Sequence, residues 1–352
     1  MNISTLLSTN AYVADILQQP QAMRDTLAAF RKQNFDDILR FTERLSANSL
    51  KRVVLTGMGS SFHGLHPLQL RLGEHNIQAQ MIETSELIHF SPKLLSPETL
   101  VVAVSQSGQS VETLRLLELI RKKASLIGVT NTPQSPLAQN SEAVLITQAG
   151  SEYSVSCKTY VTTLAALTVL GDLLTGGEYS KTISALELAS EAMAQYLSGW
   201  ESFVESAIEN MDGVQYLILA GRGSSLAAAG TGGLIIKEAA HFPAEGMSCT
   251  AFRHGPFEML SLNVFVLVYE GTGATRKLNA KLAQDIKNAG GRSELITMNA
   301  ERHIYKLPLV LDGICLPPLE ILPAQLTSVA LAIRNNHTPG QFERATKTTV
   351  IE

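Results

Sequence analysis

Val101-Val102-Ala103-Val104-Ser105-Gln106-Ser107-Gly108-Gln109-Ser110 is the stretch that decides the fold. Its four leading apolar residues are typical of a buried strand, and residues 110–122 then show a helical pattern. A strand that enters a helix through a loop of serine and glycine places hydroxyls and backbone N–H groups at the start of that helix. We therefore predict that this loop binds an anion such as phosphate.

Predicted strands and helices alternate along the rest of the chain. Strands are expected at 53–57, 80–82, 100–104, 125–129 and 143–147 in the first half, and at 214–220, 264–269, 293–298 and 307–311 in the second. Helices are expected within 10–50, after 61 as far as 70, and over 159–175, 183–210, 226–241, 275–289 and 319–334. This alternation predicts right-handed crossovers and parallel sheets, the pattern of an α/β fold.

A local repeat indicates two copies of one α/β/α unit. Gly57-Met58-Gly59-Ser60-Ser61 is echoed by Gly221-Arg222-Gly223-Ser224-Ser225. The copies differ, because the second has Tyr269-Glu270-Gly271 where the first has its serine loop, and a carboxylate there would repel phosphate. Phe62 and Leu226 occupy the position of the third glycine of a dinucleotide-binding motif, so we do not expect nicotinamide binding.

Composition narrows the class of protein. The chain has 352 residues, enough for two domains, and its net charge of -4 gives no reason to expect a nucleic-acid or membrane partner. We find no signal peptide and no apolar run of about 18 residues. Cys157, Cys249 and Cys315 are widely spaced, which suits buried free thiols. We therefore expect a cytoplasmic protein.

Two side chains of the second half suit proton transfer on a sugar. Glu238 follows Lys237 near the end of a predicted helix, and His254 precedes Gly255-Pro256. A histidine can open a sugar ring, and a carboxylate can carry a proton between adjacent carbons. A solvated surface glutamate and a histidine in an ordinary turn remain the simpler interpretations. No His, Cys and Asp residues stand at metal-ligand spacing, so we expect no metal and no cofactor.

The chain resembles tandem sugar isomerase (SIS) domain proteins, in particular the isomerase domain of glucosamine-6-phosphate synthase and stand-alone amino-sugar-phosphate deaminases and deglycases. The resemblance is carried by Gly59-Ser60-Ser61, Ser105 to Ser110, Glu152 to Ser156, Gly221-Arg222-Gly223, Lys237-Glu238, His254-Gly255-Pro256 and the polar C-terminal tail. It implies two SIS domains, each a three-layer α/β/α sandwich with a mainly parallel, flavodoxin-like sheet of about five strands. The implied parts are a helical segment (1–50), a phosphate-binding domain (51–190), a catalytic domain (191–335) and a closing tail (336–352).

The resemblance also implies roles for individual residues. The phosphate of a sugar phosphate would be held by Ser60, Ser61, Ser105, Gln106, Ser107 and Ser110, with Val155 and Ser156 lining the sugar site. Glu238 would move the proton between C1 and C2. His254 would open the ring from the neighbouring subunit of a homodimer. Lys347 or Arg344 would close the site from the C-terminal tail, depending on whether the tail is aligned from its end or on Pro339.

Three departures from the synthase pattern shape the expected function. No glutaminase domain and no N-terminal catalytic cysteine is present in the sequence, so we expect no nitrogen transfer from glutamine. Ile235 stands where the synthase has a second catalytic lysine. Arg344 would be unable to form a Schiff base, because arginine stays protonated. The resemblance thus implies a deaminase or isomerase that acts on a 6-phosphorylated amino sugar. A ketosamine 6-phosphate deglycase and a non-catalytic sugar-phosphate regulator are the alternatives.

Overall fold

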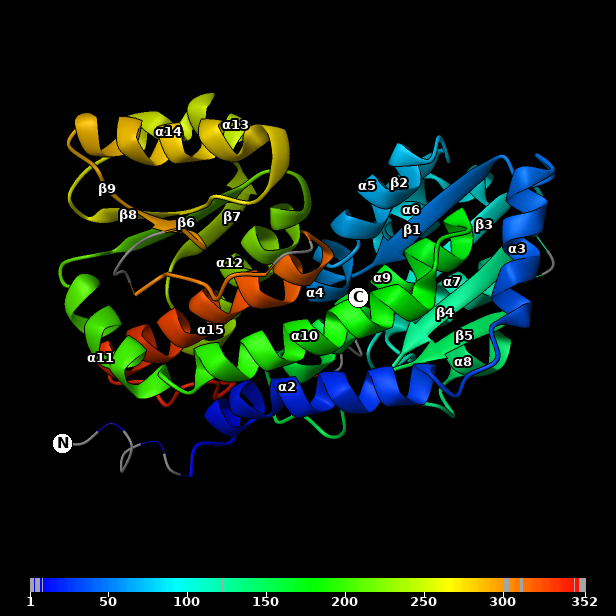
Figure 1. Ribbon diagram of the computed structural model, residues 1–352, viewed down its shortest axis with the longest axis horizontal. Helices are drawn as coiled ribbons and strands as arrows, with labels where there is room; N and C mark the ends of the chain where they lie inside the picture. The colour runs from blue at the N-terminus through cyan, green and yellow to red at the C-terminus, as the bar shows by residue number, and fades with distance from the viewer. Residues whose placement is uncertain are drawn as a thin grey trace. The chain divides into compact units, whose positions relative to one another are not determined.

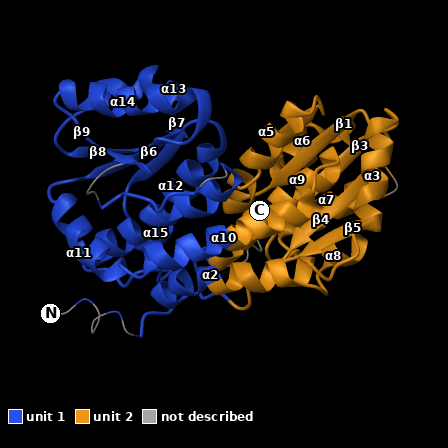
Figure 2. Cartoon of the chain, viewed as in Figure 1, with its two compact units in different colours: residues 1–20, 152–157, 188–344 blue, residues 21–151, 158–187, 345–352 orange. Residues whose placement is uncertain are grey.

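The computed structural model describes residues 3, 7, 9–121, 123–299, 304–310, 313–344 and 346–347. The chain divides into two compact units, which Figure 2 colours separately. Unit 1 comprises residues 1–20, 152–157 and 188–344, and unit 2 comprises residues 21–151, 158–187 and 345–352. Helices α2 (Ala11–Phe30) and α10 (Tyr179–Leu197) contribute residues to both units. Each unit contains one parallel sheet, which confirms the predicted α/β fold.

The sheet of unit 2 has five strands in the order β2-β1-β3-β4-β5 (Figure 1). Its strands are β1 (Arg52–Gly57), β2 (Ala79–Glu83), β3 (Thr99–Val104), β4 (Ser125–Thr130) and β5 (Ala143–Ile146). This is the flavodoxin-like order, in which the direction of progression reverses between the first and third strands. The prediction of a five-stranded parallel sheet is confirmed for this half of the chain.

Side-chain alternation along the strands explains why helices cover both faces of this sheet. Val54, Val101, Ala103 and Leu126 share one face, where they pack in a core with residues from α6 (Thr84–Phe90), α7 (Val111–Ile120) and α8 (Pro136–Asn140). Helices α3 (Asp36–Ser46), α5 (His66–Glu74) and α9 (Lys158–Thr175) form a second packed group, with α5 against β2 and α9 against β4. β3 and β4 are buried throughout, and β3 accordingly has a continuous apolar run from Leu100 to Val104.

The sheet of unit 1 has the order β7-β6-β8-β9 among the described residues. Its strands are β6 (Tyr216–Gly221), β7 (Ala244–Ser248), β8 (Val264–Tyr269) and β9 (Arg292–Ile296). One core contains strand residues such as Ile218 and Val266 with α13 (Cys249–Arg253) and α14 (Arg276–Asn288). Helix α12 (Leu226–Ala240) packs on β6 and β7, and also on α15 (Leu316–Arg334), which contacts α11 (Trp200–Asn210) in turn.

Two sequence expectations for this second sheet were wrong. The predicted strand at 307–311 does not form over its described residues. An isolated bridge pairs Thr297 with Lys306 just before it, and the N–H of Leu307 donates to the carbonyl of Thr297 at 2.8 Å. Pro308 has no N–H to donate to a ladder, and Leu309 is 70% exposed. The sheet therefore has four described strands rather than about five. Strand β7 was missed, because its short sequence contains a glycine and a glutamate and has no apolar run.

The buried residues bear on two further expectations. Cys157, Cys249 and Cys315 are all buried thiols that form no disulfide, as predicted. Gly313–Arg334 contains no unbroken apolar run of 18 residues, because Glu320 and Gln325 interrupt it, but an 18-residue window there reaches a mean hydropathy of 1.4, enough by length and composition for a membrane span. That window is 94% buried inside the protein, and a core helix has the same composition as a membrane span.

Candidate functional site

A small polar cavity lies at the carboxyl ends of β1 and β3, where the strand order of unit 2 reverses. We call it the hydroxyl cavity; its volume is about 130 Å³. It is lined by Met58, Ser61, Thr84, Val104, Ser105, Gln106, Ser107, Ser110, Thr113 and Lys347. Such a reversal point is where open α/β sheets bind ligands. Its size suits a group such as phosphate rather than a whole sugar.

The serines of this loop are arranged as hydrogen-bond donors. The hydroxyl oxygen of Ser105 accepts the N–H of Gly108 at 3.2 Å, and that of Ser107 accepts the N–H of Gln109 at 3.4 Å. Ser110 caps α7, and its oxygen lies 2.9 Å from the hydroxyl of Thr113. A hydroxyl that already accepts a backbone N–H keeps its own proton for a ligand. Together with the ammonium of Lys347, the lining is suited to an anion.

Gly108 gives the loop its shape. Its φ of +63° lies in the left-handed region that disfavours side chains. A Cβ at this position would lie 2.2 Å from Oγ and 2.6 Å from Cβ of Ser135, so no simple rotation of Ser135 would relieve the clash. The carbonyl of Gly108 accepts the N–H of Leu137 at 3.0 Å, which fastens the loop to α8. The glycine is therefore required by both space and backbone conformation.

The structure brings together most of the predicted phosphate-binding residues. Ser61, Ser105, Gln106, Ser107 and Ser110 line the hydroxyl cavity, whereas Ser60 does not. Lys347, predicted as a catalytic residue that closes the site from the tail, lines the same cavity. Arg344 lies in unit 1, where its Nη2 is 4.0 Å from Oε2 of Glu343. Met58, Thr84 and Thr113 were missed. Thr84 directly follows β2, which pairs in parallel with β1, so that both strands end at the same edge of the sheet. Knowledge of this pairing would have placed Thr84 at the cavity.

At the corresponding reversal point of unit 1, the protein's own polar side chains bond to one another. The hydroxyl of Ser225 donates to Oε1 of Glu320 at 2.7 Å. Glu270, which follows β8, forms an ion pair with Arg276 at 3.0 Å and accepts hydrogen bonds from Thr297 and Asn299. Carboxylates occupy the places where the first sheet presents hydroxyls. A carboxylate repels phosphate, and the expectation that the second half does not hold the phosphate stays a prediction.

Glu320 makes the stability of this unit depend on pH. Burial raises the pKa of its carboxyl from 4.5 to about 7, only partly offset by the hydrogen bond from Ser225, and among the described residues its Oε2 has no hydrogen-bond partner. Because the pKa is higher in the folded protein, this contribution to stability is complete below pH 4.5 and is lost as pH rises through 7. The loss amounts to about 3 kcal/mol.

We therefore expect Glu320→Gln to remove this pH dependence, since glutamine stays neutral. At pH 8 the variant should exceed the wild type in free energy of unfolding by up to about 3 kcal/mol, whereas at pH 4.5 the two should be nearly equal. Urea unfolding at several pH values measures the difference. Glu258→Gln, at an exposed glutamate of the same unit, is the control. A difference between Glu320→Gln and wild type that does not change with pH would contradict the assignment.

Glu238 lies near the C-terminal end of α12, partly exposed, in a neighbourhood built from distant parts of unit 1. Burial raises the pKa of the Tyr12 phenol well above its ordinary value, and nearby Cys157 and Glu238 raise it further. The Tyr12 hydroxyl lies 2.9 Å from the hydroxyl of Ser328 on α15. Ile235, one turn before Glu238, is fully buried and offers no second base. Glu238 thus lies within electrostatic range of a buried tyrosine whose pKa is raised.

The segment 152–157 belongs to the same unit. The hydroxyl of Ser154 donates to the carbonyl of Gly340 at 2.6 Å, and the N–H of Cys157 donates to Glu152 at 2.7 Å. Val155 is buried, and Ser156 is partly exposed. The expected role of Val155 and Ser156 in lining the sugar site stays a prediction.

His254 is exposed and ends α13, where its N–H donates to the carbonyl of Ala251 at 3.0 Å. Gly255 follows with a φ of +142° and opens the short turn Pro256–Met259. An exposed imidazole on a tight turn is accessible to a substrate or to another chain. The expected action of His254 across a dimer stays a prediction.

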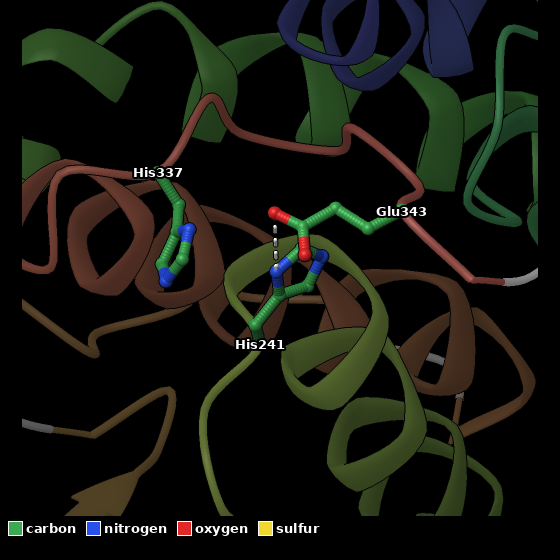
Figure 3. Close-up of side chains that lie close together, drawn as sticks. All are labelled: His241, His337 and Glu343. Carbon is green, nitrogen blue, oxygen red and sulfur yellow. Dashed lines mark ion pairs between the residues drawn. The ribbon is translucent and has the colours of Figure 1, made fainter.

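A group of potential metal ligands was also missed. His241, His337 and Glu343 place one ligand atom each within 4.8 Å of one another (Figure 3). Sequence spacing could not reveal this group, because His241 ends α12 whereas the other two residues follow α15.

Comparisons with known sequences place the first sheet in a family context. Residues 48–171 match the model of the SIS domain. The glutamine–fructose-6-phosphate aminotransferase (isomerizing) of Pyrococcus horikoshii is 27% identical over 352 residues, which are 96% of this chain and 57% of that protein. The corresponding protein of Thermococcus kodakarensis is 28% identical, with the same coverage. The chain therefore spans just over half the length of these curated relatives.

Solved structures extend the similarity in fold. The C-terminal domain of glucosamine-fructose-6-phosphate aminotransferase from Francisella tularensis has a TM-score of 0.81 at 20% identity, covering 97% of this chain and 98% of that one. Tagatose-6-phosphate ketose/aldose isomerase from Escherichia coli has a TM-score of 0.79 at 19% identity, covering 96% and 97%. Glucosamine-6-phosphate deaminase from Thermotoga maritima has a TM-score of 0.71 at 17% identity, covering 97% and 100%. The SIS-domain match thus covers the first sheet and every lining residue of the hydroxyl cavity except Lys347, while the likeness in fold extends over both sheets.

Proposed function

We propose that this protein is a phosphosugar isomerase or deaminase that acts on a 6-phosphorylated amino sugar. The observation that carries the proposal is the hydroxyl cavity, which offers several hydroxyl donors and one lysine at the reversal point of a parallel sheet. Uncharged donors can hold a phosphate firmly enough for reaction and still release the product. The named activities of the similar proteins, which all concern sugar phosphates, support the same ligand class.

In this proposal the two halves of the chain divide the chemistry. The hydroxyl cavity of unit 2 binds the phosphate, and unit 1, as a diverged second copy of the SIS domain, supplies the acid–base groups. His254, from the partner subunit of a homodimer, opens the ring of glucosamine 6-phosphate. Glu238 removes the proton from C2 and returns it to C1, which converts the aldose to an imine at C2. Water hydrolyses that imine, so that ammonia and fructose 6-phosphate leave.

Ile235 leaves Glu238 as the proposed base for proton transfer. A buried isoleucine is unable to share the proton transfer, so Glu238 is the base that the proposal requires. Lys347 lines the hydroxyl cavity, whereas Arg344 does not, and a lysine amine is able to form a Schiff base with an open-chain sugar. We therefore assign the C-terminal active-site position to Lys347.

A substrate panel tests the proposal and separates its variants. The protein is incubated with glucosamine 6-phosphate, fructose 6-phosphate and a ketosamine 6-phosphate, which is the adduct of an amino acid with the sugar phosphate. Ammonia, free amino acid and ketose phosphate are measured together. We expect ammonia and ketose phosphate in equal amounts from the first substrate. Release of free amino acid from the adduct would indicate a deglycase instead. Binding of these compounds without any turnover would contradict an enzyme and indicate a regulator.

A further inference from the structure

The side chains of His241, His337 and Glu343 meet between the end of α12 and the segment that follows α15 (Figure 3). The carboxylate of Glu343 points toward the ring of His241, with Oε1 3.6 Å from Nδ1. The rings of His241 and His337 lie with their centroids 4.9 Å apart. Two imidazoles and a carboxylate form a donor set typical of Zn²⁺ and related divalent ions.

The hydrogen bonding of His241 leaves a place for a cation. Its Nε2 lies 3.0 Å from the carbonyl oxygen of Gln341, which can only accept a hydrogen bond, so Nε2 carries a proton and donates it. In neutral His241 the bare lone pair of Nδ1 then faces the Glu343 carboxylate, and two acceptors at 3.6 Å repel each other. A metal ion between them would reverse the sign of that interaction. Metal-binding histidines commonly donate their second N–H to a backbone carbonyl in this way.

The backbone around this group holds the ligands in place before any ion binds. The N–H of Gly340 donates to the carbonyl of Ala239 at 3.0 Å, and Asn10 donates to the carbonyl of Pro339 at 3.1 Å. His241 adopts a left-handed φ of 48° at the end of α12, a conformation that glycine would adopt with less strain. Helix C-termini also carry partial negative charge, which favours a cation.

Exposure and charge allow an ion to reach this group. Glu343 is exposed and His337 is partly exposed, and His337 also borders a cavity of about 340 Å³ that neither of the other two ligands lines. Glu343 also lies near Arg344, but through Oε2 at 4.0 Å rather than through the oxygen that faces His241, and that pair is exposed and weak. Oε1 therefore stays available as a ligand.

We propose that His241, His337 and Glu343 bind one Zn²⁺-class cation that fastens the C-terminal segment to the end of α12. Each residue gives one ligand atom, and water fills the fourth position of a tetrahedral site. The ion ties down the chain a few residues before Lys347, at the end of the helix that carries Glu238. Zinc binding is measurable whether or not the protein turns over a sugar phosphate, so the test is independent of the proposed function.

The experiment uses the full-length chain, stripped with a chelator, dialysed, and titrated with zinc sulfate in a calorimeter. We expect one ion per chain. Changing an outer partner of a metal ligand costs about 10–100-fold in affinity, so His337→Ala and Glu343→Gln should each weaken binding by about 100-fold or more. His241→Gly should do the same while suiting the left-handed backbone, which guards against misfolding. His75→Ala, at an exposed histidine of unit 2, should bind zinc like the wild type.

Proteolysis provides a second readout of the same site. Arg344 is 89% exposed and directly follows Glu343, so trypsin cleavage after it reports on the mobility of the segment. We expect zinc to slow this cleavage about tenfold in the wild type and in His75→Ala, but not in the three ligand variants. Zinc binding at less than one ion per chain, or equal affinity in the wild type and the ligand variants, would overturn the proposal. Tail protection that follows pH but not zinc would also overturn it, since a protonated His241 would then account for the contact with Glu343.

Discussion

Glu238→Gln is expected to reduce turnover by about a thousandfold or more while leaving sugar-phosphate binding nearly intact. The amide has the shape of the carboxylate but is unable to accept a proton from C2, and general-base catalysis contributes about 10²–10⁴-fold to rate. No second base replaces it one turn earlier, because Ile235 occupies that position and is buried. The phosphate contacts belong to the hydroxyl cavity in the other unit, so the affinity for the ligand should persist.

The measurement pairs turnover of the active substrate from the panel with calorimetric binding of the same compound. Exchange of deuterium from solvent into C1 of the product, followed by NMR, should disappear with turnover. Glu245→Gln changes an exposed glutamate of β7 in the same unit and should behave like the wild type. Turnover by Glu238→Gln at the wild-type rate would remove Glu238 from the mechanism. Loss of binding and turnover together would indicate a structural role beside Tyr12 instead.

Gly108→Ala is expected to abolish phosphate recognition with little change elsewhere. The added Cβ would lie 2.6 Å from Cβ of Ser135, a buried residue whose hydroxyl oxygen accepts the N–H of Ala138 at the start of α8. The loop must therefore move, and the hydroxyls of Ser105 and Ser107 move with it. Hydrogen bonds to a charged group contribute about 1.5–3 kcal/mol each, so losing two weakens binding by about 100-fold or more.

Calorimetric titration with inorganic phosphate and with glucosamine 6-phosphate measures this effect. Gly73→Ala is the matched control, since its Cβ would meet nothing within 4 Å on α5. Thermal unfolding of both variants tests whether the rest of unit 2 remains folded. If Gly108→Ala bound sugar phosphate as tightly as Gly73→Ala, the phosphate would have to bind elsewhere than in the hydroxyl cavity.

The first sheet could be predicted from the sequence because its signals are local. The apolar run 101–104 is followed at once by hydroxyls, and Ser110 lies at the position that caps a helix, so strand, loop and helix are all encoded within ten residues. The failures in the second sheet are local as well. Residues 307–311 read as a strand by hydrophobicity, but Pro308 removes a ladder donor, and β7 has no apolar run.

For the candidate site, too, the features encoded by neighbouring residues could be predicted, and those that join distant segments could not. The sequence by itself determined the parallel α/β fold and the serine loop at the end of a buried strand, because each depends on residues adjacent in the chain; anion binding by that loop stays a prediction. Only the tertiary structure decided that Lys347 rather than Arg344 lines the hydroxyl cavity, that Thr84 and Thr113 join it, and that His241 meets His337 and Glu343. Those contacts join segments distant in the chain, and their partners are set by how strands pair and helices pack, which no short sequence pattern records.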